Sequence, residues 1–368
     1  MEKPKVRISV RNLVEFILRS GDLDNSRGSS GDKEAMLKGG RLHRKIQRSM
    51  KGNYQAEVSL KRESEYEDVI IQVEGRADGI FTEDGEFWID EIKGTYGNLQ
   101  AMEVPVPVHR AQAMCYGWIY GEKEGLSQIG IQMTYSHLDT EDTRRFREIF
   151  SMEELKNWYQ KLLDDYHKWI SCSLSWKKER NASMKDLQFP FPYREGQREI
   201  VSGVYHTVSS KKTLFVQAPT GVGKTMSAIF PSVRAIGEGK GETLFYLTAK
   251  TITGTVAWEA FHTLRENGLK FKVTAITAKE KLCFLDSPEC TPEKCPYAKG
   301  HFDRVNDAVY ELWTTEEVYS REVIRAHAEK WQVCPFEMCL DLSVWVDGVI
   351  CDYNYAFDPN VHLKRFFG

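Results

Sequence analysis

The sequence predicts an α/β protein of two domains. The chain has 368 residues, which is long enough for two domains with cores of ordinary size. After about residue 190, apolar strand-like runs alternate with helical patterns, as in a parallel sheet covered by helices. Before that point, β-rich segments at 54–93 and 128–150 are flanked by helical patterns, which predicts a separate α/β unit.

Composition and charge narrow the class of protein. The chain is 41% hydrophobic and 28% charged, as globular proteins are, and no apolar run approaches the roughly 20 residues of a membrane span. The charged N-terminus lacks a signal-peptide core, so we expect a cytoplasmic protein whose eight cysteines are free thiols or metal ligands. The net charge of −3 does not indicate nucleic acid by itself. The basic run at 41–51 fits either a local phosphate-binding patch or a solvated helix face.

The elements of the first domain follow from caps, periodicity and turn residues. A helix is expected from Ser9, a suitable N-cap, to Gly21, followed by a polar loop at 21–32. A second helix runs to about Met50 and carries His43. The remaining elements are expected as strands at 54–63, 66–82 and 86–93, a helix at 108–120, strands at 128–137 and 142–150, and a helix at 151–171.

The second domain begins after a polar, proline-containing stretch. We therefore divide the chain into a domain at 1–175, a linker at 176–190 and a domain at 191–368. Its elements are expected as strands at 213–217, 243–248 and 271–276, with a helix at 253–266.

Two carboxylates and a lysine are predicted to converge on one patch of the first domain. Alternation along the expected strand at 87–93 (FWIDEIK) places Glu91 and Lys93 on one face and Asp90 on the other. Asp78 lies on the preceding strand. Because paired carboxylates repel, we expect a divalent cation between Asp78 and Glu91, and hard oxygen ligands favour Mg²⁺ or Mn²⁺. Such an ion activates water for phosphodiester cleavage, with Lys93 orienting that water. The common alternative is a strand with salt-bridged edges.

The same region resembles the RecB-like branch of the PD-(D/E)XK nucleases. A G-x-x-x-H motif ends at His43, residues 75–80 (GRADGI) are similar to the GRxDG segment of that branch, and Gln112-x-x-x-Tyr116 is similar to its QxxxY helix. The resemblance covers about residues 8–150 and implies a restriction-endonuclease-like fold. It also implies that His43 is a metal ligand and that Gln112 and Tyr116 support the lysine and the substrate phosphate.

A phosphate-binding loop opens the second domain. Residues 218–225 (APTGVGKT) follow an apolar run and precede a helix, which is the context of a Walker A loop. Its glycines let backbone N–H groups face phosphates at the positive end of the helix. Lys224 is expected to reach the β- and γ-phosphates of ATP, and Thr225 to ligate Mg²⁺. The expected nucleotide contacts are Thr220, Gly221, Val222, Gly223, Lys224 and Thr225.

The loop and its neighbours resemble superfamily 2 helicases. The form AxTGxGKT is typical of that superfamily. Residues 191–197 (FPYREGQ) are similar to its Q-motif, in which Gln197 would contact adenine. Residues 247–251 (LTAKT) are similar to motif Ia, which contacts the DNA backbone. Each of these two segments alone would be an ordinary loop or strand end.

Four cysteines form the third candidate site. Their spacing lacks the paired Cys-x2-Cys of common zinc sites and suits a [4Fe–4S] cluster. Zinc at the same positions, or buried free thiols, are the alternatives. Cys339 is a rival fourth ligand, whereas Cys351 lies in an apolar run and is expected to be a buried strand thiol. The four expected ligands are Cys283, Cys290, Cys295 and Cys334.

The cysteine region resembles the XPD/DinG family of iron–sulfur helicases. The similar segments are CPY at 295–297, CPFE at 334–337 and CDYNY at 351–355. The resemblance covers about residues 190–368 and implies a RecA-like lobe with an iron–sulfur domain inserted at about 280–340. The DEAH-type Walker B motif and second RecA-like lobe of the family are absent from these 368 residues. We therefore expect the N-terminal portion of a longer enzyme, which binds nucleotide weakly without efficient ATP hydrolysis or unwinding.

Together these resemblances imply a nuclease–helicase of DNA repair or recombination. It would use ATP, Mg²⁺ or Mn²⁺ and a [4Fe–4S] cluster, and would contact single-stranded or branched DNA mainly through phosphates. One alternative is a catalytically silent nuclease fold that guides an iron–sulfur helicase onto DNA. Another is a zinc-stabilised NTPase fragment without a DNA function. No membrane partner is expected, and the sequence does not indicate an oligomeric state.

Overall fold

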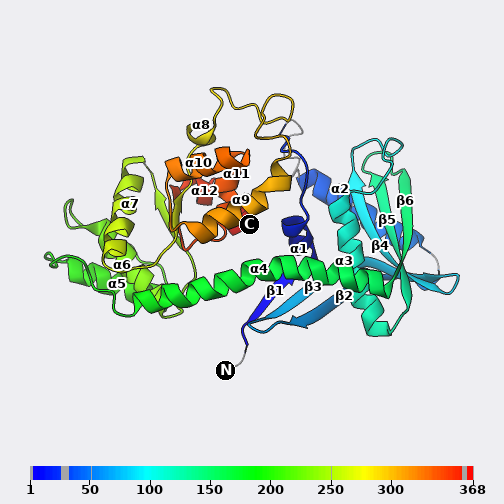
Figure 1. The fold of residues 1–368 in the computed structure, drawn as a ribbon, viewed down its shortest axis with the longest axis horizontal. Helices are drawn as coiled ribbons and strands as arrows, with labels where there is room; N and C mark the ends of the chain where they lie inside the picture. The colour runs from blue at the N-terminus through cyan, green and yellow to red at the C-terminus, as the bar shows by residue number, and fades with distance from the viewer. Residues whose placement is uncertain (1–2, 26–32, 51, 250, 359–362, 368) are drawn as a thin grey trace. The chain divides into compact units, whose positions relative to one another are not determined.

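The computed structural model describes residues 3–25, 33–50, 52–249, 251–358 and 363–367 (Figure 1). Two compact units make up the chain. Unit 1 comprises residues 1–20 and 25–171, and unit 2 comprises residues 21–24 and 172–368. The protein is thus of the α/β class, with a mixed sheet in unit 1 and a parallel sheet in unit 2.

Unit 1 is built on a six-stranded sheet in the order β1-β3-β4-β5-β6, with β2 also paired to β3. The pairs β1/β3 and β4/β5 are parallel, and the others are antiparallel. A short polar turn joins β3 to β4, as the sequence predicts. The strands are β1 (Lys5–Ser9), β2 (Gln55–Glu65), β3 (Ile70–Glu83), β4 (Glu86–Thr95), β5 (Gln128–His137) and β6 (Thr143–Ser151).

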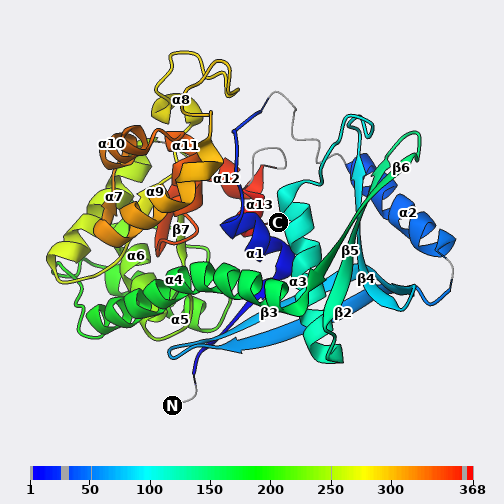
Figure 2. The same ribbon diagram turned by 45° about the vertical axis from the view of Figure 1, so that its right-hand side comes forward.

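Helices cover both faces of β4 (Figure 2). The side chains of the strand alternate between these two faces. Leu42 and Ile46 of α2 (Lys33–Ser49) pack on Ile92. Helix α3 (Pro107–Glu124) packs on β4 and β5, and its residues 111–121 are all buried. Helix α1 (Val10–Ile17) begins at Ser9, whose hydroxyl accepts from the Asn12 N–H at 3.1 Å, which confirms the predicted cap.

Unit 2 contains a four-stranded parallel sheet in the order β7-β10-β8-β9. Its core is formed by α6, α7 and the sheet, with Phe261 stacked on Phe271. No helix among the described residues is both long and apolar enough to span a membrane. The strands are β7 (Leu244–Thr248), β8 (Val273–Ala275), β9 (Val318–Tyr319) and β10 (Gly348–Asp352). The helices are α5 (Gln197–Ser209), α6 (Lys224–Gly237), α7 (Thr251–Glu266), α8 (Lys279–Leu282), α9 (His301–Thr315), α10 (Arg321–Trp331), α11 (Pro335–Leu342), α12 (Asn354–Phe357) and α13 (Lys364–Phe367).

The strand predicted at 213–217 does not form. The segment has no regular structure, and Phe215 is 93% exposed between Leu214 and Val216, which are also exposed. An apolar run becomes a strand only where a neighbouring strand supplies hydrogen bonds. Both edges of β10 are occupied, by β7 and by β8, so this central strand offers the segment no place.

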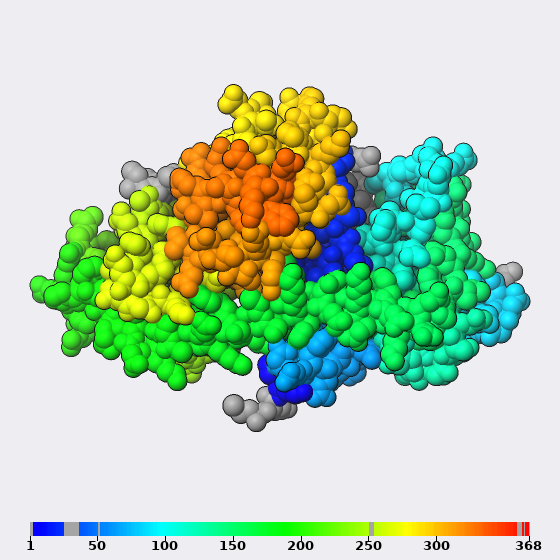
Figure 3. All heavy atoms as spheres, viewed as in Figure 1, coloured from blue at the N-terminus to red at the C-terminus, as the bar shows by residue number. Residues whose placement is uncertain are grey.

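Helix α4 (Met152–Met184) extends well past the predicted end at residue 171. Its residues from Cys172 onward belong to unit 2, including those for which the sequence predicts a linker. One side of the helix is exposed (green in Figure 3). Arg180 and Met184, one turn apart, are 4% and 1% exposed and pack into unit 2.

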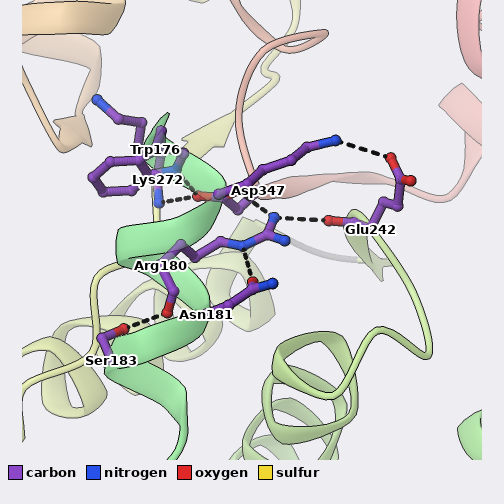
Figure 4. A network of polar contacts seen from close by, with 8 residues as sticks. Trp176, Arg180, Asn181, Ser183, Glu242, Lys272 and Asp347 are labelled. Carbon is purple, nitrogen blue, oxygen red and sulfur yellow. Dashed lines mark hydrogen bonds and ion pairs between the residues drawn. The ribbon is translucent and has the colours of Figure 1, made fainter. Parts of the chain in front are cut away.

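A buried polar network joins α4 to the start of the strands of unit 2 (Figure 4). Asp347, just before β10, pairs with Arg180 at 2.7 Å and accepts from the Trp176 indole N–H at 2.8 Å. It also accepts from the backbone N–H of Lys272 at 2.9 Å, just before β8. The Lys272 ammonium lies 4.5 Å from the centre of the Trp176 ring, and Arg180 donates to the Glu242 carbonyl before β7.

Replacing Asp347 by Ala should therefore destabilise unit 2. Removing one partner of a buried ion pair leaves an uncompensated charge, at a cost of about 3–5 kcal/mol. The matched control is Glu179→Ala, which breaks the exposed pair of Glu179 with Lys270 (2.8 Å) and should cost far less, because exposed ion pairs contribute little to stability. Urea denaturation followed by tryptophan fluorescence measures both. Equal costs for the two variants would show that the network does not hold α4.

Candidate functional sites

The structure brings the predicted carboxylate–lysine residues of unit 1 together. His43 Nδ1 of α2 lies 3.7 Å from Asp78 Oδ1 of β3. Asp78 Oδ2 accepts from the Ile92 N–H at 2.7 Å, which fixes this carboxylate at the edge of β4. The Lys93 ammonium lies 2.7 Å from Glu91 Oε1. Two pairs, His43–Asp78 and Lys93–Glu91, thus lie beside β4, near enough for the Asp78 charge to act on Glu91.

Burial dominates the electrostatics of Glu91. The residue is 5% exposed, and its Oε2 atom is buried without a hydrogen-bond partner. This burial, reinforced by the negative charge of Asp78, raises the pKa of Glu91 to about 7 against the opposing effect of Lys93. A buried, unpartnered carboxylate oxygen is costly. The site therefore favours a cation that would pair with both carboxylates.

Helix α3 supplies the two residues of the QxxxY pattern. Gln112 is 3% exposed, and its Oε1 atom is buried without a partner. Burial, reinforced by the negative charges of Glu91 and Asp78, raises the pKa of Tyr116. A Cβ on Gly75 would lie 2.7 Å from the Tyr116 hydroxyl oxygen, so only glycine admits the ring at this approach.

Asp90 lies on the opposite face of β4, as alternation predicts. Its carboxylate accepts from Thr134 (2.6 Å), Gln132 (2.9 Å) and the Tyr54 hydroxyl (3.1 Å). Burial raises the pKa of Asp90. The sequence analysis missed this network. Its signal is the polar alternation of Gln132, Thr134 and Ser136 along the otherwise apolar strand β5.

The donors present fit Mg²⁺ or Mn²⁺ in type. Carboxylate oxygens of Asp78 and Glu91 and the His43 imidazole are ligands for such ions, and the unpartnered Glu91 Oε2 atom is available. However, no group of three or more His, Cys, Asp or Glu side chains in the described part of the chain is close enough together to hold a metal ion. Glu91 Oε1 is instead taken by Lys93.

His109 makes the stability of unit 1 depend on pH. Burial, and then the charges of Lys93 on β4 and Arg11 on α1, lower its pKa to about 4, and its Nδ1 atom lies 3.2 Å from the Tyr135 hydroxyl of β5. The unfolded chain binds a proton near pH 6.5 and the folded chain only near pH 4. Below pH 6.5 the unfolded chain binds this proton and the folded chain does not. The free energy of unfolding therefore falls as the pH decreases from 6.5 towards 4, by about 2 kcal/mol at pH 5.

Urea denaturation at pH 7.5 and pH 5 tests this expectation. Because glutamine does not titrate, His109→Gln should remove this part of the pH dependence. A variant that loses as much stability as the parent chain between the two pH values would contradict the assignment.

The predicted nucleotide-binding residues form one loop and the start of α6. Gly221 and Gly223 have φ of 85° and 80°, the left-handed conformation that glycine adopts readily. Thr220 and Val222 lie in the same loop, and Lys224 and Thr225 begin the helix. The Lys224 ammonium donates to the carbonyls of Ala218 (3.0 Å) and Pro219 (2.8 Å), so the lysine caps its own loop.

Gln197 packs against this loop. It is 4% exposed, and its Oε1 atom accepts from the Arg194 N–H at 3.0 Å. A Cβ on Gly223 would lie 2.6 Å from Gln197 Nε2, and the Arg194 guanidinium donates to the Gly221 carbonyl. In the middle of β7, the Tyr246 hydroxyl donates to Thr225 Oγ1 at 3.3 Å. Lys250, part of the predicted motif Ia, lies outside the described residues.

The four predicted cysteine ligands line one small cavity in unit 2. Cys295 and Cys334 are each 7% exposed, and the quartet lies among apolar side chains. Burial raises the pKa of the Cys334 thiol to about 12, so it is neutral unless a metal ion binds it. The rival ligands lie elsewhere, with Cys339 3.7 Å from Thr274 Oγ1 and Cys351 within β10. The cavity lining includes Cys283, Cys290, Cys295 and Cys334.

A short N-terminal segment completes the cysteine cavity. Residues 21–24 belong to unit 2, although the sequence predicts only a polar loop there. Leu23 is 7% exposed, lines the cavity, and donates its N–H to the Ala298 carbonyl at 2.8 Å. The backbone of Gly21 donates to Asp303 and accepts from Phe302. No local pattern predicts this contact, because its partners are nearly 280 residues away in sequence.

The sequence analysis also missed a pocket of about 540 Å³ in unit 2. It lies at the carboxyl ends of β7, β8 and β10, where Thr248, Ala275 and Asp352 are found. Ligands of open parallel sheets bind at this edge. The Thr277 hydroxyl, which also lines the pocket, is buried without a partner.

Comparisons with known proteins give a limited result. No protein-family model matches the chain. A stretch of 47 residues is 40% identical to part of the probable ATP-dependent helicase MJ0942 of Methanocaldococcus jannaschii, and covers 12% of this chain and 7% of that protein. A crystal structure of SSO0001 aligns with 20% identity over 44% of this chain and 78% of that chain, with a TM-score of 0.29. The comparisons thus indicate a link to helicases at a coarse level only.

Proposed function

We propose that unit 1 is a metal-dependent DNA nuclease and that unit 2 is part of an ATP-driven, XPD/DinG-type iron–sulfur helicase. One observation carries the nuclease proposal: His43, Asp78, Glu91 and Lys93 meet at one strand, where a buried Glu91 oxygen lacks a partner. Their order and types match the RecB-like PD-(D/E)XK pattern. A structural salt bridge alone does not account for the unpartnered oxygen.

The chemistry would follow from these groups. Asp78, Glu91 and His43 would hold Mg²⁺ or Mn²⁺, which supplies charge stabilisation and an activated water for phosphodiester cleavage. Lys93 would orient that water or pair with the scissile phosphate. Gln112 and Tyr116, on the facing helix, would position the lysine and the phosphate. The buried face of β4 excludes bulk water from this side of the site.

Three features of unit 2 support the motor. The Walker A loop has left-handed glycines and begins a helix, as a phosphate cradle requires. Four cysteines line one cavity, whose thiols would hold a [4Fe–4S] cluster. The short match to a probable ATP-dependent helicase is consistent with a helicase-type function. We propose DNA repair or recombination as the process in which the two activities would act together.

Cleavage of single-stranded DNA with and without metal tests the nuclease. We expect a labelled oligonucleotide to be cut with Mg²⁺ or Mn²⁺ and to stay intact in EDTA, because Lys93 alone cannot activate water sufficiently. Lys93→Ala should slow cleavage by about a hundredfold. A rate unaffected by EDTA would refute the proposed metal site.

A DNA-binding module without catalysis is the second candidate. It is favoured by the Lys93–Glu91 pair, which occupies a potential ligand oxygen, and by the absence of a ready three-donor group among the described residues. This candidate predicts DNA binding that Lys93→Ala changes little, with no cleavage in any metal ion. The cleavage assay therefore separates the two candidates.

A further inference from the structure

We propose that a pocket at the end of β4 binds a nucleobase of the DNA strand held at the carboxylate–lysine site. This inference rests on the proposed nuclease function and adds a binding subsite to it. The pocket has a volume of about 630 Å³, within the range of small-molecule sites. The proposal rests on its lining residues Tyr96, Asn98, Gln100, His137, Asp142 and Arg144.

The pocket lies close to the proposed cleavage site, two residues further along β4. Lys93 pairs with Tyr135 in the β4/β5 register, and Thr95 pairs with His137. Two residues of strand advance by about 7 Å. The pocket therefore begins next to Lys93 on the same sheet, and a single DNA strand at the carboxylates would reach it with a neighbouring nucleotide.

Tyr96 offers the surface on which a base would stack. The residue is 48% exposed, so part of its ring is accessible to a ligand. The His137 ring stands edge-on to it, with the ring centres 6.4 Å apart at an angle of 89°. The two aromatic rings line one side of the pocket, and such a wall suits a flat, aromatic ligand.

The polar groups of the pocket fit a base better than a phosphate. His137 Nδ1 accepts from the backbone N–H groups of Asp139 (3.3 Å) and Thr140 (3.2 Å), which leaves the proton, and a donor, on Nε2. The guanidinium of Arg144 donates to the carbonyls of Leu99 and Gln100, at 2.9 Å each. Arg144 is thus anchored to its own loop through one nitrogen, Nη1. The lining also contains the Asp142 carboxylate, which opposes the arginine charge and repels phosphate.

The loop that forms the pocket is already ordered. Arg144 fixes its carbonyls, the Gly97 N–H donates to Thr95 Oγ1, and the Gln100 N–H donates to Asn98 Oδ1 at 2.9 Å. Such Asx-type contacts hold a loop in one conformation. A base would therefore bind without the entropic cost of ordering the loop, so that stacking contributes directly to affinity.

Binding of a fluorescent oligothymidylate, measured by anisotropy in the cleavage-impaired Glu91→Gln background, tests the pocket. Loss of stacking on one base should weaken binding by about tenfold in Tyr96→Ala, whereas Tyr96→Phe should bind like the parent. Moving a single abasic site along the oligonucleotide should reveal one position where base loss weakens binding only if Tyr96 is present. Free thymidine monophosphate should compete poorly, because the Asp142 carboxylate in the lining repels its phosphate.

The outcomes separate the pocket from the nuclease. If Tyr96→Ala binds within twofold of its parent, or if no abasic position depends on Tyr96, the base-binding pocket is refuted, even when the wild-type chain cuts DNA. If the abasic pattern appears but no metal supports cleavage, the pocket stands and the nuclease fails. Tight binding of free thymidine monophosphate that requires Tyr96 would overturn the assignment to a DNA strand.

Discussion

Replacing Glu91 by Gln is expected to abolish metal-dependent DNA cleavage, with a loss of about a hundredfold or more. The substitution keeps the shape of the side chain but removes the charge that would hold the cation beside Asp78. One Glu91 oxygen is buried without a hydrogen-bond partner, and a bound cation would satisfy it. Cleavage of a labelled oligonucleotide in Mn²⁺ measures the loss.

Folding and catalysis can be separated in this experiment. Glutamine removes a buried charge, so the Glu91→Gln chain should remain folded. Mn²⁺ should raise the Tm of the parent chain and leave that of Glu91→Gln unchanged, because only the parent binds the ion tightly. The matched control is Asp90→Asn, a neighbouring buried carboxylate on the opposite face, which should still cleave. If Asp90→Asn loses cleavage and Glu91→Gln keeps it, the metal binds on the Asp90 face of β4 and the proposed site is refuted.

Local patterns predicted the elements around this site well. The bounds of β5 (Gln128–His137) agree with the predicted range, and β4 and β6 begin within a residue of theirs. Alternation placed Glu91 and Lys93 on one face of β4, because this rule depends only on neighbouring residues. The turn between β3 and β4 then brought Asp78 to Ile92.

Predictions failed where a segment's structure depends on distant partners. The apolar run at 213–217 has the composition of a strand, but strand formation requires a neighbour that the run itself cannot specify. The polar stretch after residue 171 hid the helical spacing of Trp176, Arg180 and Met184. Trp176 and Arg180 bind Asp347 and Glu242, which lie far along the chain. Leu23 likewise became buried only through residues near 298.

The cysteine quartet shows the opposite balance. Sequence context selected Cys334 over Cys339, and the structure separates the two: Cys334 lines the cavity, whereas Cys339 lies beside Thr274. The cavity alone does not identify a metal, because neutral buried thiols can also pack among apolar side chains.

Replacing Cys334 by Ser is expected to remove a bound [4Fe–4S] cluster and to destabilise unit 2 by several kcal/mol, since metal binding and folding are coupled in such sites. Protein purified without oxygen should show broad visible absorption that Cys334→Ser lacks. Cys339→Ala, which alters a thiol that is buried away from the cavity, should keep the full absorption and bound iron. If the protein is colourless and holds one zinc ion per chain that Cys334→Ser lacks, the four cysteines are the ligands but the bound metal is zinc and not a cluster. Equal iron content in both variants would exclude Cys334 as a ligand.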